Sequence, residues 1–189
     1  MTGVLDVLGL VITALERTRV RYTIGGSFAS SFAGEPRASL DADIVVEMDR
    51  DQVAPFVEAL GTTFYADEDA LRRAVMSGSS TNVIHQASGV KVDLFVASSP
   101  LDRQQLARRR PVTVDVGRVW YVHSPEDILL QKLLWYRRGG ESSDRQWRDI
   151  LGILLVRGET LESAYVDDTA VKLQLNDLLE RARREVQGG

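Results

Sequence analysis

Two aspartates, two residues apart, are the side chains of this chain best suited to metal chemistry. Asp41 and Asp43 lie in a segment that is predicted to be a strand. Because side chains alternate along a strand, both carboxylates fall on one face, with their Cα atoms roughly 7 Å apart. Neighbouring acids are costly without a cation between them, and a hard divalent cation prefers carboxylate oxygens. The other face is apolar and carries Leu40, Ala42, Ile44 and Val46.

A glycine turn precedes this strand. Gly25 and Gly26 follow the apolar Ile24, and a residue without Cβ allows close backbone approach. Ser27 is a favourable N-cap for a following helix, whose first amides and dipole suit an anion. Arg37, in the loop before the acidic strand, is either a solvated charge or a contact for a triphosphate. A phosphate cradle beside a metal pair predicts a nucleoside triphosphate site.

Two later residues are candidates for the same site. Asp93 is the one acid of the predicted strand 90–96, whose other face is apolar; the alternative is an edge-strand acid that faces water or pairs with an arginine. Lys132 leaves a half-apolar helix face, and a compact ammonium suits phosphate. The alternative for Lys132 is a surface lysine that snorkels to water. The chain has only three lysines, and its other cationic side chains are arginines.

The elements that position these residues follow from hydrophobic periodicity and turn residues. Periodicity predicts a mixed, twisted α/β sheet flanked by helices, with a helical C-terminal part, and we expect an α/β core over 1–100 and a hairpin and helical part over 101–189. Helices are predicted over 4–17, from Ser27 to about Gly34, and over 51–60, 68–76, 101–110, 124–138, 143–156 and 168–186. Strands are predicted over 21–24, 39–47, 61–65, 81–86, 90–96, 112–116 and 118–122.

Composition excludes several classes of protein. The chain has 189 residues, 44% of them hydrophobic, which is typical of a globular core. A net charge of −4 argues against a protein that coats nucleic acid through bulk charge. The absence of cysteine excludes disulfides, zinc–thiolate sites and thiol catalysis. No segment has the pattern of a secretory signal or a membrane span, so we expect a cytoplasmic protein.

The order of these motifs resembles the nucleotidyltransferase superfamily of the polymerase-beta type. The resemblance rests on Gly25-Gly26-Ser27, followed after a helix by Asp41-x-Asp43, and on Asp93 in a later strand. It implies that Asp41, Asp43 and Asp93 are catalytic ligands of Mg²⁺ or Mn²⁺. It also implies that Gly25, Gly26, Ser27 and Arg37 bind the nucleotide.

The helical part resembles the small bacterial toxin nucleotidyltransferases of the AbiEii kind. The motifs concerned are a late lysine, Lys132, and the pair Arg148-Asp149. That branch usually has another acid where this chain has Gly152. The alternative for Asp149 is a local pair with Arg145 at helical spacing. The resemblance implies that Lys132 neutralises charge on the leaving group.

Together these residues predict a metal-dependent transfer of a nucleoside monophosphate from a nucleoside triphosphate to an acceptor hydroxyl. Two cations held by the three aspartates would orient the triphosphate and activate the acceptor. The acceptor lies on RNA or protein, as in toxin–antitoxin systems with a possible antitoxin partner, or on a small molecule such as an antibiotic. A third alternative is a non-catalytic relative that binds a nucleotide or a partner protein.

Overall fold

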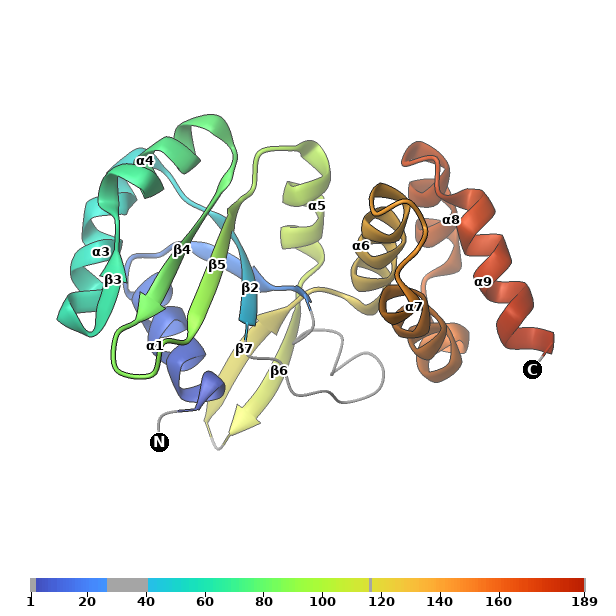
Figure 1. The fold of residues 1–189 in the computed structure, drawn as a ribbon, viewed down its shortest axis with the longest axis horizontal. Coiled ribbons are helices and arrows are strands. Elements are labelled where there is room, and N and C mark those ends of the chain that lie inside the picture. Colours follow the sequence, from blue (N-terminus) through green and yellow to red (C-terminus); the bar gives the residue numbers. More distant parts are fainter. Residues whose placement is uncertain (1–2, 27–40, 116, 189) are drawn as a thin grey trace. The chain divides into compact units, whose positions relative to one another are not determined.

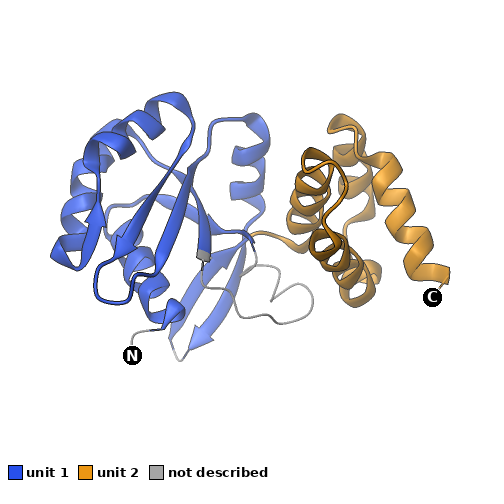
Figure 2. Cartoon of the chain, viewed as in Figure 1, with its two compact units in different colours: residues 1–28, 38–122 blue, residues 29–37, 123–189 orange. Residues whose placement is uncertain are grey.

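The computed structural model describes residues 3–26, 41–115 and 117–188 (Figure 1). These residues form two compact units, which Figure 2 shows in separate colours. The described part of the first unit comprises residues 3–26, 41–115 and 117–122, and the second comprises residues 123–188. The first unit contains the sheet, and the described residues of the second unit form helices alone.

Within the described residues, the sheet of the first unit has seven strands in the order β3-β4-β5-β2-β1-β7-β6. Strand β2 pairs antiparallel with β1 and parallel with β5, and β1 pairs parallel with β7, so the predicted mixed α/β sheet is confirmed. The remaining pairs, β3 with β4, β4 with β5 and β6 with β7, are antiparallel. The strands are β1 Arg21–Ile24, β2 Asp41–Glu47, β3 Phe64–Ala66, β4 Ser80–His85, β5 Lys91–Val96, β6 Arg110–Asp115 and β7 Arg118–Val122.

Alternation along the central strands gives the sheet one apolar face. Ile24, Ile44 and Leu94 are completely buried, whereas Asp43 and Asp93 lie on the opposite face and are half-buried. Helices α1, α3 and α4 complete this core with their own apolar stripes. The helices and turns of the first unit are α1 Val4–Arg17, η1 Arg50–Gln52, α3 Val53–Leu60, η2 Gly61–Thr63, α4 Glu68–Ser77 and α5 Pro100–Arg108.

Helix α1 is joined to β1 by a partly buried polar contact. The hydroxyl of Tyr22 donates to Glu16 Oε1 over 3.1 Å. Burial, followed by the charge of Glu16, raises the pKa of the Tyr22 phenol well above its usual value. The phenol therefore stays protonated and remains a donor, which ties the last turn of α1 to the strand that leads to the glycine turn.

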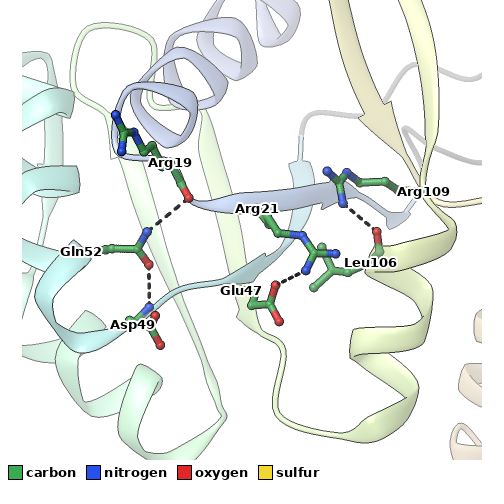
Figure 3. Close-up of polar contacts among 7 residues, drawn as sticks. All are labelled: Arg19, Arg21, Glu47, Asp49, Gln52, Leu106 and Arg109. Carbon is green, nitrogen blue, oxygen red and sulfur yellow. Dashed lines mark hydrogen bonds and ion pairs between the residues drawn. The ribbon is translucent and has the colours of Figure 1, made fainter.

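Helix α5 ends earlier than the sequence predicts. We predicted a helix over 101–110, but α5 ends at Arg108, and Arg110 already pairs with Val122 in the sheet. A residue before proline avoids helical backbone angles, which ends the helix ahead of Pro111. Pro111 lies in β6, an edge strand, where a missing N–H group is tolerated. The Arg109 side chain donates to the carbonyl of Leu106, a free acceptor at the helix end (Figure 3).

The second unit begins with well-capped helices. Ser124 accepts a hydrogen bond from the Asp127 amide and Pro125 opens α6, as the sequence predicts. Tyr136 and Trp147 pack with ring centroids 5.0 Å apart, and the Trp147 indole donates to Glu185. These contacts join three helices into one core. The elements are α6 Pro125–Arg138, α7 Asp144–Arg157, η3 Gly158–Thr160, α8 Ser163–Lys172 and α9 Asn176–Gly188.

One predicted helix is wrong. We predicted a single helix over 168–186, but the chain turns between α8 and α9 at Gln174, which has φ of +57°. The Leu175 amide donates back to the Ala170 carbonyl over 2.8 Å, and Leu175 is completely buried. The chain therefore leaves the helix at this point, and Leu175 is buried in the core. No described helix is both long enough and apolar enough to span a bilayer.

Replacing Gln174 with glycine should stabilise the protein. Glycine adopts a positive φ without the Cβ conflict, so we expect the free energy of unfolding to rise by about 1 kcal/mol. Gln174→Ala is the matched control, because alanine keeps the Cβ and gains nothing. Chemical denaturation followed by circular dichroism measures both variants. Equal stability of the two would show that the backbone at this turn is unstrained.

Candidate functional site

Gly26 lies directly against the carboxylate of Asp43. The Gly25 amide donates to the carbonyl oxygen of Asp43 over 2.8 Å, which fixes the turn to β2. Gly26 has φ of +59°, a conformation that glycine adopts without steric cost. A Cβ on Gly26 would overlap Asp43 Oδ2 and come within 2.8 Å of Cγ. Glycine is therefore required at this position both by the backbone and by the carboxylate beside it.

The register of β2 and β5 brings two predicted catalytic acids together. Asp43 and Asp93 are direct partners in this parallel pair. Adjacent strands lie about 4.8 Å apart, so the two side chains leave the same sheet face from neighbouring positions. Asp41 is in register with Lys91, two residues along the same two strands and therefore on the same face. The backbone thus places all three aspartates within two adjacent rows of the sheet.

Three of the predicted side chains cannot be assigned contacts. Ser27 and Arg37 lie outside the described residues, and so does the side chain of Asp41. Of the predicted nucleotide-binding residues, the structure describes Gly25 and Gly26, which form the turn beside Asp43. The roles predicted for Ser27 and Arg37 remain predictions.

Sequence reasoning missed a cation within the acidic site. The Lys91 ammonium lies 2.7 Å from Asp93 Oδ2, and 40% of the Lys91 side chain and 23% of the Asp93 side chain are exposed. Lys91 precedes Asp93 by two residues in a strand, so both side chains share one face. That spacing, in a chain with three lysines, was the signal that could have revealed the pair.

The described residues fit a divalent cation in their chemistry. Asp43 and Asp93 offer carboxylate oxygens, the ligands that Mg²⁺ and Mn²⁺ prefer, from adjacent positions. Among the residues whose side chains are described, no group of three acids, histidines or cysteines could hold a metal ion. The predicted third ligand is Asp41, so the described set supplies two of the three carboxylates.

Lys132 is buried in the second unit and is not the snorkelling surface lysine of the alternative interpretation. Only 7% of Lys132 is exposed, and its ammonium lies 2.8 Å from Asp149 Oδ2. This pair joins α6 to α7. Arg148, predicted from the same late motif, is exposed on α7, and Gly152 has open space around the place of a Cβ. Lys132 and Asp149, which come from the two late sequence motifs, therefore form an ion pair with each other.

Comparisons with known proteins identify the fold. No protein-family model matches the sequence, and no curated protein matches it. Among solved structures, ANT(2'')-Ia in complex with adenylyl-2''-tobramycin matches with a TM-score of 0.55 and 11% identity, over 89% of this chain and 95% of that chain. An antigenic nucleotidyltransferase-like protein from Paracoccidioides brasiliensis matches with a TM-score of 0.53 and 18% identity, over 93% and 90%.

A third solved structure of a nucleotidyltransferase also matches this chain in fold. The lincosamide antibiotic adenylyltransferase LnuA, bound to lincomycin, matches with a TM-score of 0.50 and 15% identity, over 77% of this chain and 93% of that chain. At such low identities the likeness concerns the fold. The chain therefore has the fold that these nucleotidyltransferases share.

Gly26→Ala should damage the site far more than a glycine substitution elsewhere. The new Cβ must displace the Asp43 carboxylate, so we expect a loss of about 2 kcal/mol in the free energy of unfolding and a roughly tenfold weaker triphosphate affinity. Gly61→Ala is the matched control, since Gly61 has φ of +63° and nothing near its Cβ position. Calorimetric titration with a nucleoside triphosphate should separate the two, and equal binding by both variants would contradict the assignment of the turn.

Removing Lys132 alone should destabilise the second unit. Lys132→Ala leaves the Asp149 carboxylate buried without its ammonium, which should cost about 3 kcal/mol. The double variant Lys132→Met/Asp149→Leu should recover most of that loss, because it removes both charges. Thermal melting followed by circular dichroism tests this, and a single variant as stable as the double would show that the pair contributes no charge compensation.

Proposed function

We propose that this protein is a metal-dependent nucleotidyltransferase that moves a nucleoside monophosphate from a nucleoside triphosphate to an acceptor hydroxyl. One observation carries the proposal: the Gly25-Gly26 turn packs on the Asp43 carboxylate, which has Asp93 as its partner in the next strand. The proposed phosphate-binding turn therefore lies beside the two carboxylates that would bind a cation. The fold shared with nucleotidyltransferases supports this proposal.

The proposed site residues other than Lys132 divide into those that hold the metal and those that hold the nucleotide. Asp41, Asp43 and Asp93 would hold the divalent cation, which when bound neutralises phosphate charge and lowers the pKa of the acceptor hydroxyl. The Gly25 amide is committed to the Asp43 carbonyl, so Gly25 positions the turn. Gly26 and Ser27 would contact phosphate oxygens, with Arg37 as an additional cation.

The reaction itself exchanges one phosphorus–oxygen bond for another. The acceptor oxygen forms a bond to the α-phosphorus, and the bond from that phosphorus to the β-phosphate oxygen breaks. Pyrophosphate leaves with the electron pair, and the acceptor proton passes to solvent. Positioning and charge compensation account for most of the catalysis of such a transfer.

Lys132 has a separate role in the proposal. Its ammonium would neutralise charge on the departing pyrophosphate, the role that the resemblance implies. The Lys132 ammonium lies 2.8 Å from Asp149 Oδ2. Asp149 thereby acts as the residue that holds Lys132 in place before the nucleotide binds.

The acceptor belongs to one of two classes. A hydroxyl of RNA or protein is expected if the chain acts as the toxin of a toxin–antitoxin pair. A small-molecule hydroxyl is the second candidate, and LnuA, which shares the fold, is named as a lincosamide antibiotic adenylyltransferase. A net charge of −4 also suits a cationic small molecule better than a polyanion.

Label transfer decides between them. The protein is incubated with each α-labelled nucleoside triphosphate and Mg²⁺ or Mn²⁺, in separate reactions with RNA, protein, aminoglycosides and lincosamides. We expect covalent label in one acceptor pool together with one equivalent of pyrophosphate. Asp43→Asn should lower this transfer by at least roughly 100-fold, about 2.7 kcal/mol of barrier.

The controls make this assay decisive. Asp67→Asn changes an acid that caps α4 outside the site, and it should leave transfer unchanged. The double variant Lys132→Met/Asp149→Leu should be folded but slow. If it stays within about twofold of wild type, under ~0.5 kcal/mol, Lys132 is structural only. Absence of label and of pyrophosphate in every pool would overturn the proposed function.

A further inference from the structure

The acidic face of the sheet contains its own cation. Lys91 starts opposite Asp41 in the register of β2 and β5, and its ammonium lies 2.7 Å from the carboxylate of Asp93. A lysine on an open sheet face is able to extend into water, where its charge is best solvated. Lys91 instead follows its own strand towards the row that contains Asp43 and Asp93. Its position indicates attraction by the carboxylates of that row.

The ion pair between Lys91 and Asp93 reduces repulsion between neighbouring carboxylates. Asp43 and Asp93 are direct neighbours, and like charges at such separation destabilise a folded protein near neutral pH. An ammonium beside Asp93 compensates part of that repulsion. A divalent cation bound by the same carboxylates would compensate the repulsion with a larger charge. The Lys91 ammonium and the divalent cation would repel each other if both were bound there.

We propose that Lys91 is an internal counter-ion that stabilises the acidic site before metal binding and competes with the divalent cation for it. This inference rests on the proposed function, because it assigns a metal to the same carboxylates. Lys91 is displaced when the metal binds. The exchange is feasible because the Lys91 side chain is 40% exposed and can rotate into water at little cost.

The same sheet face provides a matched control. Arg21 and Glu47 form an ion pair on β1 and β2, also 2.7 Å long, with 49% and 36% of the side chains exposed (Figure 3). Glu47 is four residues from Asp43 along β2, so this pair lies roughly 13 Å from the acidic row. It matches the Lys91–Asp93 pair in length and in sheet face but lies away from the proposed site.

Direct Mn²⁺ binding tests the inference without relying on activity. Electron paramagnetic resonance counts free Mn²⁺ during titration of wild type, Lys91→Met and Arg21→Met. We expect Lys91→Met to bind Mn²⁺ about fivefold more tightly than wild type at low ionic strength, and this difference should shrink in high salt. Arg21→Met should match wild type. Adding Asp43→Asn to Lys91→Met should abolish the gain.

Thermal stability provides a second readout. Without metal, Lys91→Met should melt at a lower temperature than Arg21→Met, and saturating Mn²⁺ should remove that difference. Equal or weaker Mn²⁺ affinity in Lys91→Met, with clear binding by wild type, overturns the counter-ion while the proposed function stands. Absence of Mn²⁺ binding in wild type and in Lys91→Met overturns the metal site and the counter-ion together.

Discussion

The site depends on the missing side chain of Gly26. The Asp43 carboxylate occupies the space where a Cβ would lie, and the neighbouring Gly25 amide is bonded to the Asp43 carbonyl. The turn after β1 therefore packs directly against the acidic end of β2. Parallel pairing of β2 with β5 then sets Asp93 beside Asp43. A larger residue at Gly26 would push the glycine turn away from the Asp43 carboxylate, and the proposed phosphate and metal sites would then separate.

Two ion pairs, one in each unit, differ in their exposure to water. Lys91 compensates Asp93 on the open sheet face, where both side chains keep contact with water. Lys132 compensates Asp149 in the second unit, where 9% and 8% of the side chains are exposed. The buried pair is costly to break from one side, whereas the exposed pair opens easily. These two pairs suit different tasks: the first is able to yield to an incoming cation, and the second holds a lysine in a fixed place.

Sequence patterns predicted the fold well where local chemistry and packing agree. Strict alternation around Asp43 and Asp93 gave the strands and their acidic face, and Ser124-Pro125 gave the start of α6. The break at Gln174 was missed because the positive φ is imposed by burial of Leu175 and has no glycine to signal it. The contact of Lys132 with Asp149 was also missed, since a pairing between two helices depends on tertiary geometry that spacing alone does not specify. Lys91 and Asp93 lie two residues apart in one strand, so their spacing already placed both on one face.

Paramagnetic broadening by Mn²⁺ tests the central claim most directly. In an amide NMR spectrum of the wild-type protein with a non-hydrolysable nucleoside triphosphate, the first traces of Mn²⁺ should erase the signals of Gly25, Gly26, Asp43 and Asp93. Signals of Glu68 and Asp69 should persist, because these acids lie in the first turn of α4, on another part of the first unit. Loss of the Glu68 and Asp69 signals first, or uniform broadening across the chain, would contradict a metal–triphosphate site at the glycine turn.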